Sequence, residues 1–513
     1  MDRRTVVTVM VMMGIFLLWD RFYIQPKLQK TTGPQSVPTQ QVSQSSAAPV
    51  KAAGPEVSES IDLGTSEAVV SNSPKLFKNW ALKNYKVNLK DPATTVSLET
   101  VGHQADGMGD LIFDRPEFLY LSQVQGTLEK TSQGAILWKY EDQNVRMERA
   151  YSADPQQPGL VTVDINVQFK AAAPGNLFVS LLGQSNEKDE DLIDRRLVFS
   201  SQKEFSYQEL KGAIEQSAVP FPMNWIGVTN RYFLFTLLKS SEGPSSGLIQ
   251  GLAENQGRVM IVYPLQGGAV RSQLKAFFGP KELGLLRSVH PSLEQTIDFG
   301  WFTVFAYPLL RFMKFLNELV RNWGVAIILL TLAVKLVTFP LTYKSMKSMK
   351  QMAKLNPQIQ KLREKYGNDK EALNREMMLL MRTQGYNPLA GCLPILIQMP
   401  VFFALYRVLY SSTELYQAPF MLWIQDLSAK DPLYITPVIL TAVMFVQQKL
   451  TPNTASDPMQ AKLLLWMPVI FGVFMLQLPS GLTLYMLVNA LAGIVQQVVL
   501  NKKLEMGNAA TAS

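Results

Sequence analysis

The chain has 513 residues, of which 47% are hydrophobic and 18% are charged, and its formal net charge is +8. One cysteine and two histidines exclude an intramolecular disulfide framework and any metal centre built from several cysteines. No G-x-x-x-x-G-K-[ST] sequence for nucleotide phosphates is present. We therefore expect no resident metal, no cofactor and no enzyme activity.

The positive charge is concentrated beside one apolar run. Segment 344–386 carries ten basic and four acidic side chains, whereas segment 411–432, after the next apolar run, has one lysine against three acidic residues. The positive-inside rule places the basic segment in the cytoplasm. This predicts that both termini are cytoplasmic, and it explains the basic balance without sequence-specific binding of nucleic acid.

The N-terminal segment 1–24 has the pattern of a transmembrane anchor. Arg3 and Arg4 precede an apolar stretch from Thr5 to Trp19, and charges follow that stretch in place of a cleavage site. A cleaved signal peptide is the alternative. Segment 25–74 is rich in Gln, Ser, Pro and Ala, so we predict a flexible linker that cannot bury enough apolar surface to fold.

Segment 75–300 changes to short runs in which apolar and polar residues alternate. In the clearest run, from Val161 to Phe169, every second residue is Val, Ile or Phe. Glycine, proline and asparagine turn signals separate such runs, which predicts an all-β sandwich on the extracytoplasmic side. The other expected strands are 86–89, 111–121, 135–140, 177–182, 232–238 and 258–263.

The rest of the chain predicts helices in or on a membrane. Segment 301–322 has helical period and one charged stripe, which indicates an amphipathic helix in the membrane interface; a helix packed on the β domain is the alternative. A five-helix core at 323–500 and a cytoplasmic tail at 501–513 follow. With the anchor, the fold class is a multi-span α-helical membrane protein with six transmembrane helices and a large extracytoplasmic β sandwich. The five core spans are expected at 323–343, 388–410, 433–448, 463–478 and 480–500.

Lys335 lies near the middle of the first core span, where a lysine costs about 2.5–3.5 kcal/mol. No Asp or Glu occurs in any of the five predicted spans, so the sequence supplies no counter-ion there. One interpretation is structural, with the lysine bonded to Thr, Gln and Asn between helices. The other is a hydrated, positively charged groove. Its candidate residues are Lys335, Thr331, Thr338, Gln398, Tyr485 and Asn489.

Segment 344–386 is predicted to form a cytoplasmic helical hairpin. Its turn is expected at Gly367, Asn368 and Asp369, with Asn368 and Glu371 as the capping pair of the second arm. Six methionines and ten basic residues suit it to bind varied apolar segments and anionic lipid, although methionine at helical spacing also commonly fills a core. The candidate hairpin residues are Lys347, Lys350, Met349, Arg363 and Met377.

Several motifs between residues 308 and 500 carry a resemblance to a known family. On these motifs the chain resembles the YidC/Oxa/Alb membrane protein insertases, in the long form of Gram-negative inner membranes. Over the linker and β domain the resemblance rests only on an anchor followed by a large external domain. The motifs are Asn322-Trp323-Gly324, Phe339-Pro340-Leu341-Thr342, Asn387-Pro388-Leu389-Ala390-Gly391-Cys392-Leu393-Pro394, Gln398-Met399-Pro400-Val401-Phe402, Leu422-Trp423-Ile424-Gln425-Asp426-Leu427, Asp457-Pro458-Met459-Gln460 and Leu478-Pro479-Ser480-Gly481-Leu482.

The resemblance implies a fold, a location and partners. The external domain would be a periplasmic sandwich of the galactose-mutarotase type, and the core spans would form a groove open to cytoplasm and lipid. Thr331 and Tyr485 fall on positions linked with substrate contact, and Lys335 stands where bacterial members usually carry arginine. The implied partners are nascent membrane proteins, the Sec translocon, the signal recognition particle pathway, the ribosome and membrane lipids.

The functional hypothesis is a membrane protein insertase and chaperone of the inner membrane. A hydrophilic segment of a nascent chain would enter the groove toward Lys335 while its apolar segment moves into lipid, with or without the Sec translocon. Burial of the apolar segment drives the step without nucleotide. Two alternatives remain: a small-molecule transporter, for which an intramembrane lysine is equally suited, and a membrane-tethered periplasmic carbohydrate-binding protein.

Overall fold

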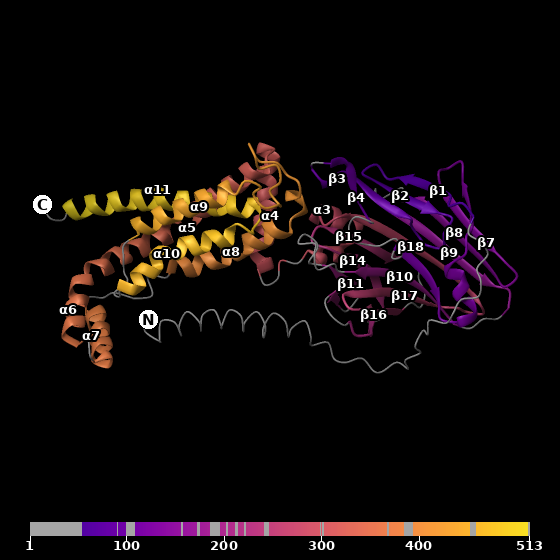
Figure 1. Ribbon diagram of the computed structural model, residues 1–513, viewed down its shortest axis with the longest axis horizontal. Coiled ribbons are helices and arrows are strands. Elements are labelled where there is room, and N and C mark those ends of the chain that lie inside the picture. Colours follow the sequence, from indigo (N-terminus) through magenta and orange to yellow (C-terminus); the bar gives the residue numbers. More distant parts are fainter. Residues whose placement is uncertain are drawn as a thin grey trace. The chain divides into compact units, whose positions relative to one another are not determined.

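The computed structural model describes residues 54–89, 91–98, 108–154, 157, 159–171, 175–184, 195–201, 204–210, 214–219, 222–240, 246–297, 299, 302–366, 369–383, 393–451 and 458–510. These residues divide into two compact units, one of strands up to residue 298 and one of helices from Phe299 onward (Figure 1). The predicted anchor at 1–24 and the predicted linker up to residue 53 lie outside the described residues.

The first unit consists of antiparallel strands in three sheets, with three short helices: η3 (Pro116–Ser122), α3 (Leu283–Val289) and η5 (Pro291–Thr296). The four-stranded sheet has the order β1 (Ser58–Asp62), β2 (Ser66–Ser71), β3 (Asn79–Asn88) and β4 (Asp91–Ser97). The five-stranded sheet has the order β13 (Ser217–Val219), β16 (Ser246–Ala253), β17 (Gln256–Pro264), β10 (Asn176–Gln184) and β5 (Met108–Phe113). The nine-stranded sheet has the order β12 (Phe205–Glu209), β11 (Arg196–Ser201), β14 (Met223–Thr229), β15 (Phe233–Lys239), β18 (Ala269–Pro280), β9 (Leu160–Phe169), β8 (Val145–Ala153), β7 (Ile136–Glu141) and β6 (Thr127–Lys130).

Period-two alternation explains why these segments are strands. In β9, Val163, Ile165 and Val167 are buried, while Asp164 between them is exposed. Successive side chains of a strand point to opposite faces, so this pattern covers a core with one face and meets solvent with the other. The prediction of an all-β domain is confirmed.

A buried arginine joins the small sheet to the large one. The side chain of Arg149 on β8 is 1% exposed, and its guanidinium lies 3.7 Å from the ring centroid of Trp138. Its Nη1 donates to the carbonyls of Pro74 and Lys75 at 2.8 and 2.7 Å, and its Nη2 donates to the carbonyl of Ser73 at 2.9 Å. One side chain therefore holds the segment before β3 against the nine-stranded sheet.

The predicted linker is wrong where β1 and β2 form. Ile61, Ala68 and Val70 are buried on the inner face of this pair. The prediction failed because Ser and Glu residues stand between these apolar residues and give the segment a polar average composition. The pair adds to β3 through β2, so its apolar residues are covered by the rest of the domain and not by the segment itself.

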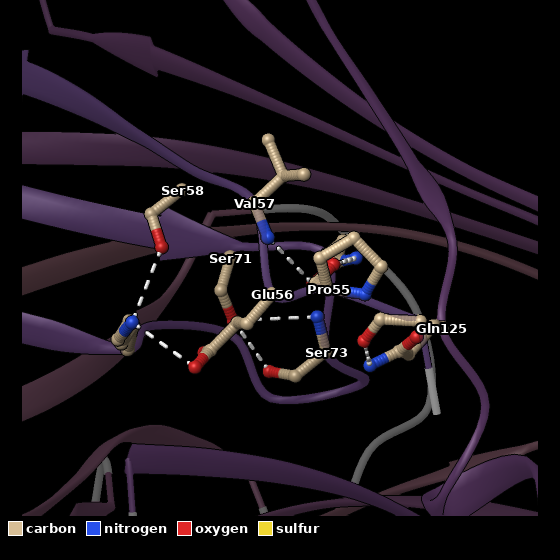
Figure 2. A network of polar contacts seen from close by, with 10 residues as sticks. Pro55, Glu56, Val57, Ser58, Ser71, Ser73 and Gln125 are labelled. Carbon is tan, nitrogen blue, oxygen red and sulfur yellow. Dashed lines mark hydrogen bonds and ion pairs between the residues drawn. The ribbon is translucent and has the colours of Figure 1, made fainter. Parts of the chain in front are cut away.

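Polar contacts also hold the chain just before β1 in place (Figure 2). The backbone N–H of Val57 donates to Oδ1 of Asn72 at 3.3 Å, and Nε2 of Gln125 donates to the carbonyl of Gly54 at 3.3 Å. The folded domain thus begins by residue 54, about twenty residues before the predicted start at 75.

One expected strand ends earlier than predicted. Segment 111–121 was predicted as continuous, but β5 ends at Phe113 and the 3₁₀ helix η3 begins at Pro116. Proline has no N–H for a sheet ladder and favours the first turn of a helix. Leu121 is nevertheless buried, and it belongs to the helix η3 and not to a strand.

The second unit is helical. Its elements are α4 (Thr303–Val320), α5 (Trp323–Lys354), α6 (Asn356–Tyr366), α7 (Lys370–Thr383), α8 (Leu393–Ser411), η8 (Thr413–Leu415), α9 (Ile435–Leu450), α10 (Pro458–Met475) and α11 (Ser480–Ala510). Within the part of the chain that the structure describes, Trp323–Gln351 of α5 and Ser480–Lys502 of α11 are long and apolar enough to cross a membrane, and α9 and Leu465–Met475 are shorter apolar helices. Each predicted core span contains a helix; the count of six transmembrane helices stays a prediction.

Three helix boundaries differ from expectation. Helix α5 continues past Pro340 to Lys354, and the next helix, α6, begins at Asn356 with Pro357 in its first turn, where a proline is tolerated. The hairpin itself consists of α6 and α7, beyond the end of α5 (Figure 1). The predicted tail is helical as far as Ala510, as part of α11.

The cap of α7 is also one residue later than predicted. Oδ1 of Asp369 accepts hydrogen bonds from the backbone N–H groups of Glu371 and Ala372 at 3.1 and 3.0 Å, whereas the predicted cap Asn368 and the turn residue Gly367 lie outside the described residues. Asn and Asp are equally good N-cap residues, but only the aspartate adds a negative charge at the positive end of the helix dipole.

Close packing joins α9, α10 and α11. Leu440, Met475 and Ala490, one from each helix, form a buried cluster. Gly472 of α10 lies against Thr441 of α9, and a methyl group at Gly472 would overlap Thr441 Oγ1. Small residues allow such backbone approach in helix packing within membranes.

Candidate functional site

The helical unit contains a cavity of about 450 Å³ between α5, α8, α9, α10 and α11. Its lining combines one lysine, several amide and hydroxyl side chains, and apolar residues. The lining residues are Lys335, Thr338, Leu341, Thr342, Met346, Met349, Gln398, Met399, Phe402, Gln447, Thr451, Phe471, Met486, Asn489, Gly493, Gln496 and Gln497. Four of the six candidate groove residues, Lys335, Thr338, Gln398 and Asn489, therefore lie around one space.

Among the described residues of this lining, Lys335 is the only charged one. Its side chain is partly buried, and no ion pair joins it to a carboxylate within the described ranges. The nearby hydroxyl of Thr338 donates to the carbonyl of Val334, four residues earlier, at 2.9 Å. The ammonium group, with its three donors, is therefore available to an acceptor that enters the cavity.

Thr331 and Tyr485 are not part of the cavity lining. Each side chain is 1% exposed. The hydroxyl of Thr331 donates to the carbonyl of Ile327 at 2.6 Å, and the hydroxyl of Tyr485 accepts from Nε2 of Gln398 at 2.9 Å. Gln398 thus faces the cavity, with Tyr485 directly behind it.

The loop between α8 and α9 covers the N-terminal ends of α5 and α11. Asn322 caps α5 by accepting from the N–H of Val325 at 3.1 Å, and its Nδ2 donates to the carbonyl of Phe420 in the loop at 2.9 Å. The N–H of Gly481 donates to the carbonyl of Leu427 at 2.8 Å. The cavity lies further along these helices, from Lys335 to Met349 on α5, toward the end of α5 that leads into α6.

An aspartate fixes the same loop at the start of α9. The carboxylate of Asp431 accepts from the N–H groups of Leu433 and Thr436 at 3.0 and 2.8 Å. Burial acts to raise the pKa of Asp431, but these hydrogen bonds outweigh it and hold the pKa below its ordinary value. The loop is therefore fixed by charge-assisted hydrogen bonds at neutral pH.

The outer faces of the helices carry exposed apolar side chains. Leu336 and Val337, next to Lys335 in α5, are 75% and 80% exposed, and Ile470 and Val473 of α10 are also mostly exposed. Soluble monomers rarely expose large apolar patches of this kind, whereas lipid covers them in a membrane protein. The polar groups thus face inward and the apolar groups outward.

Two family models match the chain. One, described as the 60Kd inner membrane protein, matches residues 315–508, and the other, described as the YidC periplasmic domain, matches residues 76–312. A protein named membrane protein insertase YidC, from Syntrophus aciditrophicus, is 34% identical over 479 residues, which cover 89% of this chain and 87% of that protein. The chain belongs to the YidC family of membrane protein insertases.

Other relatives in the YidC family match over a shorter stretch. A protein of the same name from Geotalea daltonii is 45% identical over 286 residues, which cover 55% of this chain; the chain thus spans about half the length of that relative, 54%.

A solved structure described as an active YidC insertase with its first transmembrane domain resolved is 19% identical, with a TM-score of 0.37, over 97% of this chain and 99% of that one.

The candidate hairpin residues do not form one site. Met349 lies in α5 and lines the cavity, and Nζ of Lys350 donates to the carbonyl of Asn501 in α11 at 3.3 Å. Lys347 is exposed on α5, Arg363 lies on α6, and Met377 is half-buried on α7. Only the last two belong to the hairpin that the structure contains.

Sequence reasoning missed part of the cavity wall in this YidC-family chain. Nε2 of Gln497 donates to Oγ1 of Thr451 at 2.9 Å and so joins α11 to α9 beside the cavity. Gly493 lets Gln447 approach α11, since a methyl group there would overlap its amide. The available signal was the spacing of Gly493 and Gln497, one helical turn apart on one face of the last span.

Proposed function

We propose that the protein inserts nascent polypeptides into the inner membrane and assists their folding and assembly. The observation that supports this most directly is the cavity with Lys335 on its wall, no carboxylate beside that lysine within the described part of the chain, and exposed apolar faces outside. Membership of the YidC family agrees with this reading.

In the proposed mechanism the cavity lowers the barrier for polar groups to enter the bilayer. An unsatisfied polar group in hydrocarbon costs several kcal/mol. Lys335 offers donors to a carboxylate or carbonyl of the guest, and the amides of Gln398 and Asn489 offer both donors and acceptors. The guest's apolar segment then moves into lipid, which is favourable by about 1.5–3 kcal/mol for each large apolar side chain, so no nucleotide is needed.

Orientation and partners are part of the proposal. The excess of basic residues in 344–386 places the α6–α7 hairpin in the cytoplasm and the β unit in the periplasm, with six transmembrane helices and both termini cytoplasmic. The hairpin would then receive nascent chains from the ribosome or the signal recognition particle pathway. The protein would work alone or beside the Sec translocon, with lipid around the outer faces of its helices.

Insertion into proteoliposomes tests the proposal. The client is a small membrane protein with an acidic tail, and protease protection measures insertion by the wild type, Lys335→Ala and Lys335→Arg. We expect Ala to fail and Arg to work, because arginine keeps the charge. Lys347→Ala, which removes an exposed lysine of the same helix outside the cavity, is the matched control and should insert normally. Equal insertion by all variants would make Lys335 structural, and no insertion by the wild type would refute the proposed function.

The β unit separates this proposal from the carbohydrate-binding alternative. The described residues between 54 and 298 belong to a compact unit of their own. If insertion depends on the helical unit, a chain lacking residues 54–298 should insert the acidic-tailed client at a rate close to that of the full chain. Complete loss of insertion, with the shortened protein present in the membrane, would favour a primary function in the β unit.

A further inference from the structure

A second charged residue within the spans lies outside the cavity. The five predicted core spans contain two charged residues, Lys335 and Arg407, and of these the cavity lining described above includes only the lysine. Arg407 lies on α8, four residues before the helix ends at Ser411, which is about 6 Å along the helix axis. A long arginine side chain at this depth extends its guanidinium to the membrane–water interface.

Arg407 lies on the side of α8 that packs against α4. One turn earlier, the ring of Phe403 stacks on that of Phe302, the N-cap residue of α4, with ring centroids 5.5 Å apart. Residues four apart share a face of a helix, so Arg407 comes next on this face. Just beyond the end of α8, Nζ of Lys314 on α4 pairs with Oε1 of Glu414 in η8. Arg407 therefore lies along α8 between two contacts with α4.

This arginine lacks a counter-ion within the described part of the chain. Its side chain is partly buried, and no hydrogen bond or ion pair joins it to another described residue. The carboxylate of Glu414 is 7% exposed and already paired with Lys314. Glu318 of α4 lies one turn beyond Lys314, and so further from the level of Arg407. The guanidinium, with its five N–H donors, thus needs an acceptor of opposite charge from outside these residues.

The surroundings of Arg407 fit a phospholipid. Phe305, Phe312 and Phe315 are 53%, 39% and 58% exposed and make the outer face of α4 apolar, as a surface for acyl chains requires. On α8, the rings of Tyr406 and Tyr410 stack with centroids 5.6 Å apart. Tyrosines are typical of the headgroup level of a membrane. The arginine therefore lies where a lipid phosphate would be expected.

We propose that Arg407 binds the phosphate group of one anionic phospholipid at the junction of α4 and α8. A guanidinium matches a phosphate with two parallel N–H···O bonds, which a lysine cannot form. An anionic headgroup is favoured over a zwitterionic one, because a headgroup ammonium would need a carboxylate and Glu414 is occupied by Lys314. This site lies outside the cavity, and its existence does not depend on the insertion of a client.

Native mass spectrometry of the full-length protein in detergent tests the proposal. Dioleoylphosphatidylglycerol is titrated in, and the affinity for the first bound lipid is measured. We expect Arg407→Gln to weaken it about tenfold, the factor that corresponds to one charge-assisted hydrogen bond, and Arg407→Lys to weaken it less. Arg271→Gln removes an exposed arginine from β18 in the β unit and is the matched control, which should bind like the wild type.

Three results would overturn the proposal. The first is equal affinity of the wild type and Arg407→Gln. The second is equal affinity of the wild type for dioleoylphosphatidylglycerol and dioleoylphosphatidylethanolamine, which would remove the role of the anionic headgroup. The third is displacement of the lipid by millimolar inorganic phosphate, which would show a site for a free anion. Elution of Arg407→Gln as a single species at the wild-type volume in size exclusion separates loss of the lipid site from misfolding.

Discussion

Gly472→Ala tests the close approach of α9 and α10 beside the cavity. A Cβ at position 472 would overlap Oγ1 of Thr441 and would lie 3.0 Å from both its Cβ and its Cγ2. Thr441 cannot easily turn away, because its side chain is β-branched and its hydroxyl donates to the carbonyl of Pro437 at 2.8 Å. The two helices must therefore separate, or the threonine must give up its hydrogen bond.

The expected loss of stability follows from three terms. Overpacking costs about 1–3 kcal/mol, and the lost hydrogen bond costs about 1 kcal/mol. Replacing glycine by alanine inside a helix returns about 1 kcal/mol. The net loss in the free energy of unfolding is thus about 1–3 kcal/mol. Thr441→Ala removes Oγ1 and Cγ2, so the double variant should recover most of the loss.

Unfolding by sodium dodecyl sulfate in mixed micelles, followed by tryptophan fluorescence, measures these differences. Gly493→Ala is the matched control in the same bundle, because its Cβ meets only the amide end of the flexible Gln447 side chain. We expect it to be as stable as the wild type or up to about 1 kcal/mol more stable, because alanine favours the helix more than glycine does. The reasoning is refuted if Gly472→Ala is as stable as the wild type, or if Thr441→Ala does not compensate for it.

Three further predictions concern the cavity and the β unit. Gly493→Ala should push the Gln447 amide into the cavity, and it should reduce insertion of the acidic-tailed client without lowering the stability of the protein. Unchanged insertion would show that the cavity tolerates the displaced amide. Arg149→Met should destabilise the β unit by about 3 kcal/mol in urea unfolding, because three partly buried carbonyls at 73–75 lose their donor, and a loss below about 1 kcal/mol would contradict that account. Burial acts to raise the pKa of Asp142, but hydrogen bonds from tyrosine hydroxyls and two backbone N–H groups outweigh burial and lower this pKa. The ionised carboxylate therefore contributes its full stabilisation above pH ~4, and this contribution disappears as the pH falls through the lowered pKa. Asp142→Asn should therefore reduce stability more at pH 7 than at pH 2, and an equal effect at both would refute this assignment.

Strand prediction succeeded where a segment carries its own pattern and failed where a neighbour completes it. Strand β9 alternates strictly over the nine residues from Val161 to Phe169, so its existence was visible in the sequence. Strands β1 and β2 bury few apolar residues each and depend on β3 for cover, which no local pattern records. The cap at Asp369 illustrates a smaller limit, since two good N-cap residues stand side by side and the sequence does not choose between them.

The candidate site shows a similar division. The depth of Lys335 and the polar stripe on its helix were readable from spacing alone. The same stripe includes Thr331, which is buried and donates its hydroxyl to the backbone carbonyl of Ile327. The sequence could not exclude Thr331 from the cavity, because a polar stripe defines one face of the helix and not how far a cavity extends along that face. Met349 was assigned to the hairpin because the predicted span ended at Tyr343, where the apolar run stops, whereas α5 continues to Lys354.

The hydrogen bonds of the cavity wall explain how a polar cavity can stand among apolar helices. Thr338, Thr342 and Thr451 each donate to the carbonyl four residues earlier, at 2.9, 3.1 and 2.9 Å. These hydroxyls are satisfied within their own helices, so they add polarity without requiring a guest. Lys335 differs, because a hydroxyl can be satisfied by a carbonyl whereas an ammonium group in such surroundings also needs an opposite charge. The hydroxyls of the wall therefore need no guest, whereas the buried Oε1 atoms of Gln496 and Gln497 have no hydrogen-bond partner and Lys335 has no opposite charge. An acidic guest should gain more from Lys335 than a neutral one of the same shape.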